Sequence, residues 1–415
     1  MAYVRKERVN LYLNIPSPIK YEDPWLATFD DRLQQLVAQK RRIAYFYEYP
    51  DTSTFRYRAF NPGQTLATNP DCGVSGAWFD RRDLETDDRF IDEADALVIC
   101  RVRYSAAVAR MIARARARDI PVLFDCDDLV FDIDRLHLLV DSLNQNQQSE
   151  AVWNDWFASI GRIGAVLRLC DGLVTTNDYL AQRAKEFDSR LQTTIMPNYL
   201  NREQQELSED IYRRKRESGW LRDGRIHIGY FSGSPTHTRD FAVAAPAIFR
   251  LLDSDPRIIL RIVGFADFDP RLKYYGDRVE FYPLQDFLNL QRLIGEVEIN
   301  IAPLQDNQFT NCKSELKFFE AAICGTLTLA TPTFAFRNSI NHGKTGLLVP
   351  AYGWDDALRE AVSIVENKTQ YVTIADAAFK YAQSAYGWDR HAATILQAVF
   401  ASGGAIDWQR NVQTG

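Results

Sequence analysis

Short apolar runs alternate with amphipathic, helix-like segments along most of the chain. In the first half such runs begin near Arg42, Ala94 and Pro121. The stretch 202–225 is polar and charged, which is typical of a linker helix, and the alternation restarts at Arg225. Because strands that alternate with helices form parallel βαβ units, the pattern predicts an α/β chain with two parallel sheets.

The length of the chain agrees with two halves, because 415 residues exceed what one ordinary hydrophobic core supports. We predict an N-terminal Rossmann-like domain over residues 1–205 and a C-terminal Rossmann-like domain over residues 206–384. Apolar residues at helical spacing from about Asp389 to Phe400 predict a further helix within the segment from about 385 to 415.

A charged stretch in the second half, Lys313–Gly325, lies where a strand is expected to lead into a helix. An apolar run at 296–302 precedes it and another apolar run follows it. In a parallel sheet this loop lies at the carboxyl edge, where free backbone N–H groups and the helix dipole favour an anion such as a phosphate. Glu320 borders the apolar stripe of the helix, and the hydroxyl pair of a sugar would satisfy its carboxylate. The alternative is an ion pair between Lys317 and Glu320 on a solvated helix face.

A second strand-to-helix loop lies early in the same half. The apolar run 225–231 leads into Ser232, Gly233 and Ser234, and a helix follows. Small residues let backbone N–H groups approach a phosphate, and Arg239 adds a side-chain donor. The alternative is an ordinary tight turn, because the full G-x-G-x-x-G pattern is absent.

Charged residues also follow two expected strands of the first half. The loop after one strand carries Arg56 and Arg58, which suit recognition of a phosphate or a sugar, although two exposed arginines at an edge would give the same pattern. The tip of the other strand carries Asp125, Asp127 and Asp128. Three acids at a carboxyl edge could bind a metal ion or take a proton from a hydroxyl, and a capping or turn role is the alternative.

Charge and cysteine usage restrict the classes of function. A formal net charge of −6 argues against general nucleic-acid binding. The six cysteines form no C-x-x-C pair and lie mostly in apolar runs, which favours reduced thiols in the cytoplasm. The opening residues Met1–Arg8 are charged and no run approaches ~20 apolar residues, so we expect neither a cleaved secretion signal nor a membrane span.

A predicted helix over about 105–118 has a basic surface. Exposure to solvent is the default interpretation of its arginines, and contact with anionic lipids at the inner face of a membrane is the alternative. The arginines are Arg110, Arg114, Arg116 and Arg118.

These features together resemble a glycosyltransferase of the GT-B architecture, most closely the retaining family 4-like, or group 1, type. The residues that carry the resemblance are the loop before Arg239, the stretch Lys313–Gly325 and the turn Gly343–Gly346, and it is strongest over 226–350. The resemblance implies two Rossmann-like domains that face a cleft, with the C-terminal helix packing back on the N-terminal domain. The N-terminal domain would bind the acceptor, and the C-terminal domain would bind the nucleotide-sugar donor.

The resemblance also implies which residues bind the donor. The E-x7-E motif of the family ends in a Glu that holds the ribose hydroxyls, and Glu320 matches it. Cys312 stands where the first Glu, placed against the donor sugar, would be, and Lys313 or Glu315 is the candidate to serve instead. Arg239 and Lys313 are the carried-over cations for the diphosphate. Backbone contacts would come from the small-residue loop: Ser232, Gly233 and Ser234.

On this interpretation the catalytic residues are Arg239, Lys313 and Asp127. The two cations stabilise the leaving diphosphate, so that no metal and no other cofactor is required, and Asp127 orients the acceptor hydroxyl. The acceptor-binding residues are Arg56, Arg58, Asp125, Asp127 and Asp128.

The activity implied is retaining transfer of a sugar from a nucleotide sugar to a hydroxyl of a glycan or a lipid-linked oligosaccharide, in surface-polysaccharide or glycan assembly of bacterial type. We expect a cytoplasmic protein that does not bind nucleic acid, with peripheral membrane contact and association with other glycosyltransferases as open alternatives. Two other functions stay open. One is a non-catalytic GT-B-fold protein that binds glycan or a partner, which the missing Glu favours, and the other is a nucleotide-sugar epimerase.

Overall fold

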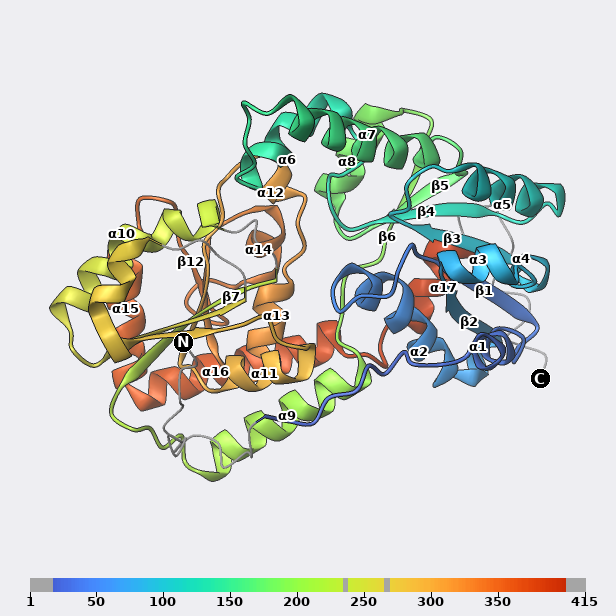
Figure 1. The fold of residues 1–415 in the computed structure, drawn as a ribbon. Coiled ribbons are helices and arrows are strands. Elements are labelled where there is room, and N and C mark those ends of the chain that lie inside the picture. The colour runs from blue at the N-terminus through green and yellow to red at the C-terminus, as the bar shows by residue number, and fades with distance from the viewer. Residues whose placement is uncertain (1–17, 234–237, 265–268, 401–415) are drawn as a thin grey trace. The chain divides into compact units, whose positions relative to one another are not determined.

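The computed structural model describes residues 18–233, 238–264 and 269–400, and these divide into two compact units (Figure 1). The N-terminal unit holds residues 23–201, 307–314 and 387–400. The C-terminal unit holds the described residues of 18–22, 202–306 and 315–386. Three short segments, 18–22, 202–205 and 307–314, therefore lie in the unit other than the one predicted for them.

The N-terminal unit is built on six parallel strands in the order β2-β1-β3-β4-β5-β6. In Figure 1, α7 and α8 lie above this sheet and α1 and α2 lie below it. The strands are β1 (Arg41–Phe46), β2 (Val74–Phe79), β3 (Ala96–Cys100), β4 (Val122–Cys126), β5 (Gly172–Thr175) and β6 (Gln192–Ile195). The α-helices are α1 (Phe29–Leu36), α2 (Asn61–Ala67), α3 (Arg81–Thr86), α4 (Phe90–Glu93), α5 (Ala106–Ala117), α6 (Leu136–Ser142), α7 (Glu150–Leu167), α8 (Asp178–Phe187), α12 (Gln308–Asn311) and α17 (Ala392–Phe400). Shorter helical turns are η1 (Arg56–Phe60), η2 (Pro70–Cys72) and η3 (Ile133–Arg135).

The C-terminal unit has a second sheet of six parallel strands, in the order β12-β11-β10-β7-β8-β9. Within this unit α10 packs against α15, and α13 packs against α11 and α16 (Figure 1). The strands are β7 (Ile226–Ser232), β8 (Ile258–Gly264), β9 (Val279–Tyr282), β10 (Ile299–Ala302), β11 (Leu327–Ala330) and β12 (Leu347–Leu348). The helices are α9 (Arg202–Glu217), α10 (Thr238–Ser254), η5 (Pro270–Arg278), α11 (Phe287–Gly295), α13 (Leu316–Ala322), α14 (Phe334–Ser339), α15 (Trp354–Glu366) and α16 (Lys368–Tyr386). The prediction of an α/β fold with two parallel sheets is confirmed.

The strands are continuous apolar runs because helices cover both faces of a parallel sheet. Every residue of β2 and of β3 is buried. Side chains at the helix starts then fix where the chain turns away from the sheet. Thr28 Oγ1 accepts the Asp31 N–H at the start of α1, and Ser105 and Asn177 cap α5 and α8 in the same way.

The tail helix α17 packs on the N-terminal unit, as predicted. Its Ile395 and Val399 side chains are buried. Thr194 Oγ1 donates to the Ala398 carbonyl at 3.2 Å, and the Arg41 guanidinium lies 3.9 Å from the centre of the Phe400 ring. The last described helix of the chain is thus part of the first sheet's hydrophobic core.

Each sheet has one point at which the direction of strand addition reverses. In the first sheet this point lies between β1 and β3, and in the second it lies between β7 and β10. In open parallel sheets, ligands bind beyond the carboxyl ends of the strands at such a point. We therefore expect a ligand site among the residues that follow these four strands.

Candidate functional site

Arg58 and Asp125 form a closed ion pair inside the N-terminal unit. Both side chains are 0% exposed, and Arg58 Nε and Nη2 donate to the two Asp125 oxygens at 2.7 and 2.8 Å. Arg58 Nη1 also donates to the Met196 carbonyl at 2.7 Å. Burial raises the pKa of Asp125 even though the Arg58 guanidinium opposes the shift. The acceptor-binding role predicted for these two residues needs correction, because neither side chain is presented to solvent.

Arg56 is turned inward as well. Its segment coils into a π-helical turn where an open loop was expected, and the side chain is 3% exposed. Arg56 Nε donates to the Thr52 carbonyl at 3.0 Å, and the guanidinium lies 4.1 Å from the centre of the Tyr57 ring. The prediction of Arg56 as an acceptor contact is corrected for the same reason as that of Arg58.

Asp127 and Asp128, by contrast, belong to a loosely paired cluster beyond the end of β4. Arg101 Nη1 lies 3.7 Å from Asp127 Oδ1, and Lys313 Nζ lies 3.8 Å from Asp128 Oδ2. Thr54 Oγ1 donates to Asp127 Oδ2 over a long 3.4 Å. Within the described residues, the Oδ1 atom of each acid is buried and accepts no hydrogen bond. Carboxylates in this condition can accept hydrogen bonds from the hydroxyl groups of a ligand.

We define the open cluster as Arg101, Asp127, Asp128 and Lys313. Its two positive side chains balance the charge of its two acids. Burial raises the pKa of Asp128, while Lys313 and Arg101 oppose that shift. Burial lowers the pKa of Arg101, but Asp127 and Asp128 more than offset it, so the net shift is upward. The cluster is partly buried, and each of its two acids has one cation nearby.

Lys313 belongs to this cluster because the segment 307–314 lies in the N-terminal unit. Phe309 and Cys312 are buried in the core of that unit, and Asn177 Nδ2 donates to the Cys312 carbonyl at 3.1 Å. Cys312, at the position of the first Glu in the family motif, is therefore a core residue. Lys313 and Arg239, predicted to bind one diphosphate, lie in different units, and their shared role stays a prediction.

The small-residue loop of the C-terminal unit follows β7. Ser232 is buried and Gly233 is exposed, whereas Ser234 lies outside the described residues. Gly264, at the end of β8, has φ of 100°, and a Cβ atom there would overlap the Ser232 carbonyl oxygen. Only glycine fits this contact, which holds the ends of β7 and β8 together. Arg239 is partly exposed near the start of α10.

Lys317 places a cation at the end of β7, and the sequence analysis did not single it out as a ligand. Its Nζ donates to the Phe231 carbonyl at 2.6 Å and lies 5.0 Å from the centre of the Tyr230 ring. The signal was available in the spacing, because Lys317 precedes Glu320 by one helical turn. Lys317, Ser232 and Gly233 thus lie at the point of the second sheet where a ligand is expected.

Glu320 lies on α13 in the interior of the C-terminal unit. The side chain is 4% exposed, and its Oε1 accepts a hydrogen bond from Gln204 Nε2 of α9 at 3.1 Å. Gln291 Nε2 of α11 donates to the backbone carbonyl of Glu320, also at 3.1 Å. Helix α9 therefore contacts the Glu320 carboxylate and α11 contacts its backbone, one turn from Lys317.

The basic surface of α5 is engaged largely by the protein itself. Arg114 pairs with Asp88 at 2.7 Å and also with Asp92. Arg118 Nη1 donates to the Ala94 carbonyl at 2.9 Å. Intramolecular pairing therefore accounts for much of this charge.

No three His, Cys, Asp or Glu side chains among residues 18–233, 238–264 and 269–400 lie close enough together to hold a metal ion. In the same ranges, no helix has the length and apolar character needed to cross a bilayer.

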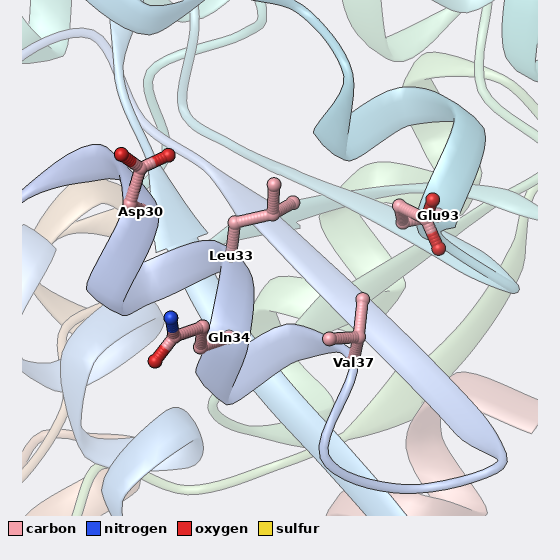
Figure 2. A pocket seen from close by; sticks show the side chains of 5 residues that line it. All are labelled: Asp30, Leu33, Gln34, Val37 and Glu93. Carbon is pink, nitrogen blue, oxygen red and sulfur yellow. The ribbon is translucent and has the colours of Figure 1, made fainter.

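A shallow hollow of about 380 Å³ lies on the N-terminal unit between α1 and α4 (Figure 2). It shares no residue with the open cluster. Its charged lining residues are both acids, and like charges of this kind repel an anionic ligand. The lining residues are Asp30, Leu33, Gln34, Val37 and Glu93. The hollow is therefore not suited to a diphosphate.

Comparison with known proteins finds a family match that covers the second sheet. Residues 226–367 match the model of the family described as glycosyl transferases group 1. A curated relative, the D-inositol 3-phosphate glycosyltransferase of Kribbella flavida, is 35% identical over 79 residues, which are 19% of this chain and 18% of the relative. The chain thus matches less than a fifth of the length of that relative.

Solved structures extend the likeness to both units at the level of the fold. The structure of Anabaena HepE in complex with UDP has a TM-score of 0.56 at 13% identity, covering 86% of this chain and 98% of that one. Sucrose-phosphate synthase from Thermosynechococcus elongatus has a TM-score of 0.55 at 16% identity, covering 86% and 97%. At this identity the likeness establishes the two-sheet GT-B fold.

Proposed function

We propose that the protein belongs to the glycosyl transferases group 1 family, whose model residues 226–367 match, and that it transfers a sugar from a nucleotide sugar to a hydroxyl group. The observation that carries the proposal is the arrangement at the end of β7. There a cation, Lys317, and a small-residue strand end adjoin a fixed carboxylate, Glu320, on one short helix.

The donor half of the proposal assigns the nucleotide to the C-terminal unit. Lys317 and Arg239 would neutralise the diphosphate, with backbone contacts from Ser232 and Gly233. Glu320 would accept hydrogen bonds from the ribose hydroxyls. The hydrogen bond from Gln204 already fixes the orientation of the Glu320 carboxylate for this role. HepE has been solved with UDP-glucose, which makes a uridine nucleotide the first donor to test.

The acceptor half assigns the accepting hydroxyl to the open cluster of the N-terminal unit. Asp127 and Asp128 each have a buried oxygen that accepts no hydrogen bond from the described residues. A sugar or polyol hydroxyl would supply the missing donor. The Kribbella relative is named for a phosphorylated polyol acceptor, so such compounds belong in the acceptor panel beside neutral glycosides and lipid-linked oligosaccharides.

The chemistry follows from these assignments. Cleavage of the bond between the sugar and the diphosphate builds negative charge on the leaving phosphate oxygen. Fixed cations at that place stabilise the transition state more than the ground state. We propose that Lys317 and Arg239 do this without a divalent metal, and that transfer retains the anomeric configuration.

The test is a screen of the full chain against UDP-, GDP-, ADP- and dTDP-sugars, measuring released nucleoside diphosphate and, with the acceptor panel, new glycosides. Release and transfer should occur with at least one donor and should persist in EDTA, and NMR of the product should show a retained anomeric configuration. Glu93→Gln, in the hollow of Figure 2, is a matched control and should behave as wild type.

Two results would contradict the proposal. Nucleotide binding by calorimetry without release or transfer would indicate a protein that keeps the fold and has lost the reaction. A donor converted to a different sugar in the absence of any acceptor would indicate an epimerase. Activity abolished by EDTA and restored by Mg²⁺ would overturn the metal-independent part alone.

A further inference from the structure

We propose that Arg101 is a positioning residue of the acceptor site, which holds the Asp127 carboxylate in the place where it meets the accepting hydroxyl. This inference rests on the proposed function. Arg101 is not among the site residues predicted from the sequence. Three independent observations support its role as a positioning residue.

The first observation is the location of Arg101. It directly follows β3, and the reversal point of the first sheet lies between β3 and β1. Its backbone N–H donates to the Asp125 carbonyl at 2.9 Å, so its position relative to β4 is fixed. A side chain at this place stands where open parallel sheets bind their ligands.

The second observation is the backbone conformation. Arg101 has φ of 51°, in the left-handed region that residues with a side chain avoid. Glycine would adopt the same conformation without strain. Strained backbone that persists in a folded protein tends to occur at functional sites, because a useful side chain offsets the strain.

The third observation is the contrast between two neighbouring ion pairs. Arg58 and Asp125 are fully buried and make two hydrogen bonds shorter than 3 Å. Arg101 and Asp127 are separated by 3.7 Å, and their side chains are 30% and 12% exposed. The first pair is complete as it stands. The second leaves hydrogen-bonding capacity on both partners, as expected for groups that act on a ligand.

The charges around the pair explain why a cation is needed at this position. Asp127 and Asp128 are adjacent in sequence, and the negative charge of Asp127 contributes to raising the pKa of Asp128. Lys313 lies near Asp128, at 3.8 Å, and Arg101 lies near Asp127. Thr54 Oγ1 is 3.4 Å from both the Arg101 guanidinium and the Asp127 carboxylate. Thr54 follows β1, so the loop after β1 contacts both members of the pair.

Three substitutions at one position separate this role from a purely structural one. Arg101→Met removes the charge and keeps the strained backbone, and Arg101→Gly removes both. Arg101→Lys restores a cation. Asp119→Gly is the matched control, because Asp119 has φ of 58° in an exposed turn remote in sequence from the cluster.

The measurements are release of nucleoside diphosphate with water as acceptor, transfer to the acceptor panel, nucleotide affinity and the thermal unfolding midpoint. We expect Arg101→Met and Arg101→Gly each to lower kcat by ~10-fold or more, the scale of one lost oriented interaction. The donor KM and the nucleotide affinity should stay within about twofold of wild type, and Arg101→Lys should recover part of the rate. Arg101→Gly should unfold at a higher temperature than Arg101→Met, since it relieves the strain.

Two outcomes overturn the proposal. If Arg101→Gly transfers at the wild-type rate, the guanidinium is dispensable and Arg101 has only a structural role. If both variants lose nucleotide affinity in step with activity, Arg101 does not act on the acceptor side. A wild-type chain that releases no nucleotide and transfers no sugar would instead contradict the proposed function, so the two failures are distinguishable.

Discussion

Lys215 carries an ammonium group into the interior of the C-terminal unit. It lies within a run of charged residues on α9, yet it is 0% exposed, and its Nζ donates to Thr326 Oγ1 at 3.0 Å. Burial lowers its pKa from 10.5 to about 8. Because the lowered pKa shows that burial disfavours the charged form, the ammonium group of this residue opposes the stability of the unit that contains it.

The stability penalty at Lys215 has a defined pH dependence. Below pH 8 the lysine is protonated in both the folded and the unfolded chain, so the penalty is fully present. Between pH 8 and 10.5 only the unfolded chain keeps the proton, so stability rises with pH across this window. Lys215→Met should raise the unfolding free energy at pH 7, by up to about 3 kcal/mol, and should lack that rise.

Denaturant unfolding of wild type and variant from pH 7 to 10.5 measures this difference. Thr326 keeps a partner in the variant, because its Oγ1 also donates to the Ile294 carbonyl at 3.0 Å. Arg214→Met, on the same helix and partly exposed, is the control and should change stability little. A variant less stable than wild type at pH 7 would show that the buried ammonium group is well satisfied.

Glu320 gives a second prediction at this scale. Glu320→Ala should weaken nucleoside diphosphate binding by about 1 to 3 kcal/mol, because it removes a charged hydrogen-bond acceptor from the proposed ribose site. Calorimetry with UDP measures the effect. Gln204→Leu removes the neighbour that donates to Glu320 and keeps the carboxylate, so it should reduce affinity less. Unchanged affinity in a folded Glu320→Ala protein would assign this carboxylate to the fold alone.

At the scale of single elements, the segment 307–314 shows how a motif position can acquire another use. Its short helix α12 packs against α6, and Phe309 and Cys312 are buried in the N-terminal core. Burial raises the pKa of the Cys312 thiol, in keeping with an inert core residue. The position at which the family has a catalytic-site acid is here filled by a small hydrophobic side chain.

Introducing a glutamate at position 312 should therefore lower the stability of the protein. We expect Cys312→Glu to destabilise the N-terminal unit by several kcal/mol, because it places an unpaired carboxylate in the core, whereas Cys312→Ala costs about 1 to 2 kcal/mol. Circular dichroism during thermal unfolding checks both. A stable Cys312→Glu protein with raised transfer activity would mean that the side chain at this position can reach the substrate.

The elements themselves were largely predictable, and several partnerships were not. β1, β3, β4, β7 and β10 are apolar runs of strand length, so local pattern was sufficient to place them. The pairing of Arg58 with Asp125 joins residues 67 positions apart, and no local pattern distinguishes that buried arginine from an exposed one. The burial of Lys215 could not be predicted for the same reason, because Lys215 lies within the charged run of α9. Burial of a charge depends on a distant partner, which periodicity and composition do not encode.

The candidate site was predictable to a similar extent. Ser232, Gly233 and Glu320 were singled out because strand ends and helix starts have local signals, and Asp127 and Asp128 because they follow a buried strand, and the roles of all five stay predictions. Arg56, Arg58 and Asp125 were misassigned because their exposure was assumed from their loop or strand-end position. Arg101 and Lys317 gave only weak signals, a charge directly after β3 and a lysine one turn before an acid.

For the whole molecule, two compact units imply that donor binding and acceptor chemistry can be impaired separately. Lys317→Met should weaken UDP affinity at least ~10-fold, because it removes a cation from the proposed diphosphate site. Asp127→Asn should lower transfer at least ~10-fold and leave UDP affinity within about twofold. Titration and transfer rates on the same preparations compare them. Parallel losses in both measurements for Asp127→Asn would contradict the separate assignments.

The position of α17 also determines when each sheet can be completed during synthesis. The ribosome makes β1 to β6 first, but the core around them includes Ile395 and Val399, which are made after all of β7 to β12. The earlier sheet therefore emerges with an apolar surface still uncovered, where a chaperone or another nascent chain can bind. A ribosome that stalls just after residue 386 leaves the second sheet with all its strands and the first sheet still without its last helix.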